Sequence, residues 1–168
     1  MSSHYSLLLF AVVALFGMTG CDRKASAERA KFQTHLDEFI REGSVLSSYT
    51  KQGVNYQTFG DQLAKAHAAF DITYPNGPSH DPIQYQHFAN AVRGWSATYK
   101  LWHRKISGTT HLHYFDRDLE LLNSVLTDAG MPHDSATTEK VSVSEAINIA
   151  MTYASEQFQK GRSMPAPK

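Results

Sequence analysis

The chain contains one cysteine, Cys21, among its 168 residues. An intramolecular disulfide needs a second thiol, and a metal site built from cysteines needs several. Both are therefore excluded, and Cys21 must have another use if it has one.

The chain also lacks an excess of charge of either sign. It has 16 basic and 16 acidic residues, a formal net charge of zero, and no basic block. Proteins that bind nucleic acid usually carry a basic surface that neutralises phosphates. Nucleic acid is therefore not an expected partner.

Recognisable catalytic motifs are missing as well. The sequence has no Gly-x-Ser-x-Gly, no Gly-x-Gly-x-x-Gly, no phosphate-binding loop and no His-Glu-x-x-His. It has no Cys-x-x-Cys-His, so it offers no covalent haem attachment. We assign no catalytic residue and no cofactor-binding residue, and the sequence favours a non-enzymatic role without deciding the question.

Long hydrophobic runs are absent too. The longest apolar stretch is Leu7–Phe16, and ten helical residues cover about half of a bilayer core. That length is typical of the hydrophobic region of a secretory signal peptide. The run is followed by Thr19 and Gly20, which have small side chains, and then by Cys21.

The residues Met18-Thr19-Gly20-Cys21 resemble the lipobox of bacterial lipoprotein precursors. The resemblance implies cleavage before Cys21, a lipid on its sulfur and an acylated new N-terminus, which together anchor a protein stably to a membrane. It implies a location in the bacterial cell envelope. Under enteric-type sorting, Asp22 implies the periplasmic face of the inner membrane.

Apolar residues recur at steps of three and four, which predicts amphipathic helices. Short connections between long helices favour antiparallel neighbours, so we predict an all-α antiparallel bundle of four to five helices after a signal peptide. No family is recognised for this globular part. The helical segments are residues 25–50, 56–74, 82–106, 111–129 or 115–129, and 142–160.

Local signals mark several helix ends. Asn55, Asp81 and Ser142 are predicted N-caps, and Ser142 has capping-box spacing to Glu145. Gly161 is a predicted C-terminal cap. The expected organisation is a signal peptide at 1–20, a lipidated tether at 21–29, a helical bundle at 30–161 and a disordered tail at 162–168.

The third helix carries the clearest apolar stripe, and both tryptophans lie on it. Aromatic residues at this spacing more often belong to a core than to a ligand pocket, so we expect the stripe to form the centre of the core. The stripe consists of Tyr85, Phe88, Val92, Trp95, Tyr99, Trp102 and Ile106.

Histidine is the compositional oddity, with nine in the chain. A hairpin between the third and fourth helices would bring His103, His111 and His113 to one end of the bundle. Imidazole suits zinc and other transition metals. However, a helical His111-x-His113 would point the two rings apart, so both could bind one metal only from an extended segment. A second, weaker group is His80, His87 and His133.

Two functions follow from these observations. The first is a membrane-anchored lipoprotein with a helical binding or protein-interaction domain, whose partners are the membrane, through the lipid, and a protein. The alternative is a metal- or cofactor-binding helical bundle that uses the clustered histidines.

Overall fold

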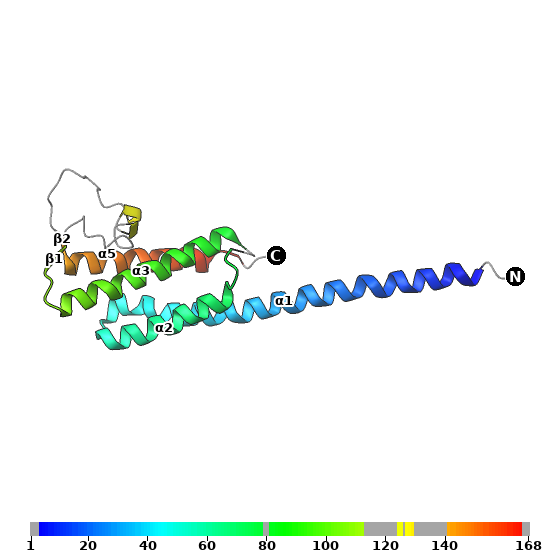
Figure 1. The fold of residues 1–168 in the computed structure, drawn as a ribbon, viewed down its shortest axis with the longest axis horizontal. Coiled ribbons are helices and arrows are strands. Elements are labelled where there is room, and N and C mark those ends of the chain that lie inside the picture. The colour runs from blue at the N-terminus through cyan, green and yellow to red at the C-terminus, as the bar shows by residue number, and fades with distance from the viewer. Residues whose placement is uncertain (1–3, 79–80, 113–123, 126, 130–140, 166–168) are drawn as a thin grey trace.

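The computed structural model describes residues 4–78, 81–112, 124–125, 127–129 and 141–165, with side chains omitted for residues 4–23, 51 and 141. This part of the chain is mostly helical, with four long helices that lie side by side over much of their length (Figure 1). The helices are α1 (His4–Gln52), α2 (Tyr56–Thr73), α3 (Pro82–Ile106) and α5 (Val143–Ser163).

Three helix starts agree with the sequence signals. Asn55 precedes α2, and its side chain accepts a hydrogen bond from the Thr58 N–H at 2.8 Å. Asp81 caps α3 in the same way. Ser142 caps α5, where its Oγ accepts from the Glu145 N–H at 3.1 Å. Side-chain acceptors thus satisfy backbone donors that have no partner within each helix, as predicted.

α1 is longer than the predicted segment of residues 25–50. It forms one helix over His4–Gln52, and its N-terminal part extends well beyond the other helices (Figure 1). Residues 24–31 are exposed, and Phe32 is the first buried side chain described in α1. Among the residues described, no helix has a stretch long and apolar enough to cross a membrane.

Aromatic rings join α1 to α2 along the length of α2. The ring centroids lie 5.5 to 6.4 Å apart, within the usual range for aromatic contacts. Earlier residues of α1 contact later residues of α2 and beyond. The pairs are Phe32–Tyr74, Phe39–Phe70 and Tyr49–Phe59.

α3 and α5 pack closely at Gly94. A Cβ atom at that position would lie 2.7 Å from the Cβ of Ala154, closer than real side chains pack. Further along, the ring Nδ1 of His87 lies 2.8 Å from Oε1 of Gln157. Small residues at the crossing allow the two backbones to come together.

The centre of the core is aromatic, as the stripe on α3 predicted. Phe88 and Trp95 are fully buried against Phe158 of α5. Ile106, however, is 61% exposed, so its assignment to the core is wrong. It lies one helical turn past Trp102, which is the last residue of the stripe that packs against the core.

The prediction that Gly161 caps the end of the last helix is wrong. α5 continues to Ser163, and Gly161 is a buried residue within it. The ring of Phe88 fills the space where its side chain would be, with a hypothetical Cβ 2.7 Å from the ring. The glycine is required for packing, and residues 162 and 163 of the predicted tail are helical.

The predicted start of a fourth helix at His111 is wrong. His111–Leu112 is a short strand, β1, that pairs antiparallel with β2 (Val141–Ser142). The Val143 N–H also donates to the carbonyl of Thr110 at 3.0 Å, which keeps this segment extended. Residues 124–125 and 127–128 are helical, whereas most of the alternative segment 115–129 lies outside the described residues.

Candidate functional site

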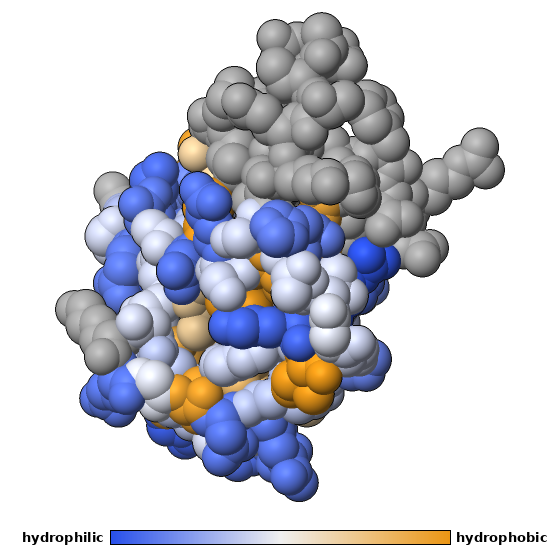
Figure 2. Space-filling view, turned by 90° about the vertical axis from the view of Figure 1, so that its left-hand side faces the viewer, coloured by the Kyte–Doolittle hydropathy of each residue, from blue (hydrophilic) through white to orange (hydrophobic). Residues whose placement is uncertain are grey.

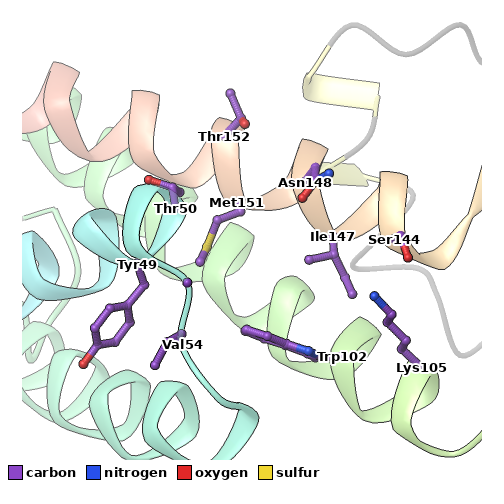
Figure 3. A pocket seen from close by; sticks show the side chains of 11 residues that line it. Tyr49, Thr50, Val54, Trp102, Lys105, Ser144, Ile147, Asn148, Met151 and Thr152 are labelled. Atoms are coloured by element: carbon purple, nitrogen blue, oxygen red, sulfur yellow. The ribbon is translucent and has the colours of Figure 1, made fainter.

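A pocket of about 510 Å³ lies where α1 and α3 end and α5 begins (Figure 3). The turn between α1 and α2 forms part of its wall. Gly53 makes this turn possible because its φ of +69° is a conformation that other residues rarely adopt. Its N–H donates to the carbonyl of Tyr49 at 3.2 Å and closes the end of α1.

One part of the lining is apolar or aromatic. In Figure 3, Ile147 extends from α5 toward Trp102 of α3, and Met151 extends toward the turn after α1. Met151 is buried, whereas Ile147 and Trp102 are half-buried and present surface to the pocket. The apolar and aromatic lining residues are Tyr49, Val54, Trp102, Ile147 and Met151.

The other part of the lining is polar and carries one charge. Lys105, in the last turn of α3, is the one charged residue in the part of the lining that the structure describes. Its ammonium lies near Ile147 and Ser144 in Figure 3. The polar lining residues and the turn glycine are Thr50, Gly53, Lys105, Ser144, Asn148 and Thr152.

The two tryptophans of the α3 stripe have different roles. Trp95 is fully buried, with its ring centroid 5.4 Å from that of Phe158. Trp102 packs against Phe59 at 5.6 Å and also lines the pocket. The expectation of a core stripe is therefore correct for Trp95, and Trp102 joins the core to the pocket.

Figure 2 looks onto the end of the molecule where α1 and α3 finish. Small hydrophobic patches lie there between predominantly hydrophilic side chains. This end of the molecule is thus largely polar where it is described.

Three buried polar atoms have no hydrogen-bond partner in the part of the chain that the structure describes. They are Ser47 Oγ, Trp95 Nε1 and Ser155 Oγ. Ser47 and Ser155 lie one turn from Thr50 and Thr152, which line the pocket. A buried donor or acceptor without a partner usually lowers the stability of a fold by about 1–3 kcal/mol. The apolar pattern of the sequence did not indicate that polar atoms would be buried here.

His103 has an aromatic neighbour on α2. The ring of Tyr56 stacks on that of Tyr99 at 4.5 Å, and the exposed His103 ring lies 6.2 Å from Tyr56. A hydrogen bond with Tyr99 is the main cause that raises the pKa of Tyr56 to about 12, and partial burial is a smaller one. His103 therefore belongs to an aromatic group at the junction of α2 and α3.

The structure does not test the predicted three-histidine metal site. His111 lies in β1, where its Nδ1 is 3.0 Å from the Thr110 hydroxyl, and His113 lies outside the described residues. No group of three metal-ligating side chains occurs within the described ranges. The site at His103, His111 and His113 stays a prediction. His80 and His133 also lie outside these ranges, and His87 contacts Gln157.

A smaller hollow of about 360 Å³ adjoins the first along α5 and shares Asn148 and Thr152 with it. The Tyr153 hydroxyl donates there to Oδ2 of Asp128 at 3.3 Å. Burial, helped by the charge of Asp128, raises the pKa of Tyr153 to about 12, so this tyrosine stays neutral at ordinary pH.

Comparison with protein-family models, with curated proteins and with solved structures gives no match to this chain. The candidate site is therefore argued from its own geometry.

Proposed function

We propose that the protein is a lipid-anchored helical binding module, and that the pocket at the end of α1, α3 and α5 is its binding site. The pocket is the observation that carries this proposal. Its volume of about 510 Å³ lies within the range of roughly 300–1,000 Å³ typical of small-molecule sites. Its lining combines an aromatic ring, aliphatic side chains and a few polar groups, as such sites usually do.

The anchor in this proposal is Cys21, with residues 1–20 as the signal peptide that is removed. The sequence Met18-Thr19-Gly20-Cys21 supports it. Asp22 favours the periplasmic face of the inner membrane. The proposal also includes an antiparallel bundle, which the contacts support because residues late in α1 pair with residues early in α2.

The length of α1 gives the pocket its position relative to the anchor. At about 1.5 Å per residue, the helix rises about 42 Å from Cys21 to Tyr49 at the pocket. The exposed residues 24–31 would form a helical stalk between the membrane and the bundle. In this arrangement the pocket faces the aqueous compartment, away from the lipid surface.

The anchor is tested by processing. After expression in a host that processes lipoproteins, mass spectrometry should find a mature N-terminus at a lipidated Cys21, and Cys21→Ser should block processing. An intact segment of residues 1–20, or cleavage at another bond, would contradict the anchor without affecting the pocket.

The binding site is tested by filling it. Asn148→Trp places a large side chain on the exposed rim of the pocket, and Gln159→Trp makes the same change at an exposed position elsewhere on α5. In a fragment screen by ligand-observed NMR, compounds bound by the wild type should be lost in the first variant and retained in the second. The pocket is not a binding site if no fragment binds the wild type saturably, or if every fragment that binds the wild type also binds Asn148→Trp.

A further inference from the structure

The charge of the pocket is one-sided. Among the described residues that line it, Lys105 is the one that carries a charge, and none is a carboxylate. None of the ion pairs found among the described residues involves Lys105. No ion pair of the described residues therefore competes with a ligand for the Lys105 ammonium.

Lys105 lies near the C-terminal end of α3. His103 and Arg104 precede Lys105, and all three lie in the last turn of the helix. Glu145 is the acidic residue in the first turn of α5, beside Ser144, but it does not line the pocket. An anion entering the pocket would thus meet a positive charge on α3 before any negative one in the lining.

An apolar surface lies beside that charge. Trp102 and Ile147 are half-buried, and Met151 is buried behind them. Figure 3 shows Lys105 and Ile147 converging from α3 and α5, with the Trp102 indole next to them. One end of the pocket therefore offers a cation, and the adjoining wall offers an aromatic face and aliphatic side chains.

We propose that the ligand of this pocket is a small amphipathic carboxylate, a class that includes aromatic acids. Its carboxylate would pair with Lys105, and its apolar body would lie against Trp102 and Ile147. This inference rests on the proposed binding function and names the chemical class of the ligand.

The lining favours a ligand that carries a single negative charge. One lysine supplies a compact point charge, whereas phosphate esters usually engage several donors or the fork of an arginine. The described lining contains no second cationic side chain. A monoanion with an apolar body uses both parts of the lining, whereas a polyanion would leave charge unpaired.

The test compares hydrocinnamate with hydrocinnamide, which has the same apolar body and no charge. Isothermal titration calorimetry with the full-length protein should show saturable binding of hydrocinnamate about tenfold tighter than that of the amide, because a hydrogen bond between two charged groups is stronger than one to a neutral amide. The difference should shrink at high salt, because screening weakens exposed charge pairs.

A matched pair of lysine variants identifies the cation. Lys105→Gln should weaken hydrocinnamate binding about tenfold and leave hydrocinnamide binding unchanged. Lys100→Gln removes an exposed lysine of α3 that does not line the pocket, and it should change neither. Hydrocinnamate should also quench the tryptophan fluorescence of the wild type. It should not do so in Trp102→Phe, which keeps only Trp95.

Two outcomes would overturn the inference. One is equal affinity of the wild type for the acid and the amide, and the other is unchanged hydrocinnamate binding in Lys105→Gln. Either outcome would leave the proposed function intact, provided that neutral fragments bind the wild type and do not bind Asn148→Trp. The absence of any fragment binding would instead remove the proposed function.

Discussion

The ring of Phe88 on α3 occupies the space where a side chain at Gly161 of α5 would begin. A Cβ there would lie 2.7 Å from the ring Cε1, and the Gly161 carbonyl accepts a hydrogen bond from Gln84 Nε2 at 3.1 Å. Tyr74, just after α2, donates to Gln84 at 3.4 Å. One backbone position on α5 thus holds α3 directly and α2 through a buried glutamine.

Gly161→Ala should destabilise the protein although alanine is the better helix former. Relieving the clash requires movement of a fully buried phenylalanine, and overpacking of this kind typically costs about 1–3 kcal/mol. Urea unfolding followed by circular dichroism measures the change. Gln159→Ala, at an exposed position two residues away, is the control and should cost less than about 0.5 kcal/mol. Equal stability of the two variants would contradict the close packing.

The same glycine shows the limit of the sequence analysis. Gly161 follows shortly after the last apolar residue of the helical pattern, Phe158, as a glycine at a helix end does. The sequence did not indicate that Phe88 would need the space. The starts of α2, α3 and α5 were predictable because each depends on a side chain and a backbone donor two or three residues apart.

The pocket could not be predicted, for a related reason. Trp102, Lys105 and Ile147 become neighbours only through the level at which α3 and α5 pack. A helical period reveals which face of a helix is apolar, but it does not reveal how far one helix is shifted along another. The aromatic stripe was the available signal, since it contained Trp102 as well as the core residue Trp95.

Replacing each tryptophan in turn should distinguish the core residue Trp95 from the pocket residue Trp102. Trp95→Ala should cost roughly 3–5 kcal/mol, as for other fully buried aromatic residues, whereas Trp102→Ala should cost clearly less because its ring is half-exposed. Guanidinium unfolding of both variants under the same conditions measures the difference. A larger loss for Trp102 would mean that the pocket wall is the main support of the fold.

Glu42 should make stability depend on acidic pH. Hydrogen bonds from Arg41 and Gln62 to its carboxylate, at 2.7 and 2.8 Å, lower the pKa of Glu42 in the folded protein. A lowered folded pKa stabilises the fold above the unfolded pKa of about 4.3, and this contribution is lost as pH falls through the folded value. The melting temperature of the wild type should therefore exceed that of Glu42→Gln near neutral pH.

That difference should shrink as the pH is lowered toward about 3, below the unfolded pKa. Differential scanning calorimetry across this range measures it, and Glu156→Gln on the exposed surface of α5 controls for the loss of a carboxylate. A gap between wild type and Glu42→Gln that stays constant with pH would contradict the role of these hydrogen bonds.

Residues before the bundle should add little to its stability. Residues 24–31 are exposed, so a chain that begins at Ala30 should unfold within about 0.5 kcal/mol of one that begins at Cys21. A chain that begins at Asp37 also loses the buried Phe32 and Leu36 and should be less stable by several kcal/mol. Urea unfolding of the three chains locates the boundary. A large loss on starting at Ala30 would move that boundary toward the N-terminus.

The histidines provide the last prediction, which separates proximity from metal binding. His103 is exposed beside Tyr56 of α2, whereas His111 lies in β1 with its ring against Thr110. A zinc site would require three ring nitrogens about 2 Å from one point, with each ring held by a further hydrogen bond. These two rings contact Tyr56 and Thr110, and neither of these contacts is with another histidine.

We therefore expect His103→Ala combined with His111→Ala and His113→Ala to leave the fold intact. Added zinc should raise the melting temperature of the wild type no more than that of the triple variant, because a ligand stabilises only the state that binds it. Calorimetry with and without zinc, on protein that carries no histidine tag, makes the comparison. A zinc-dependent rise confined to the wild type would establish the alternative function of a metal-binding bundle, and restoring each histidine in turn would then identify the ligands.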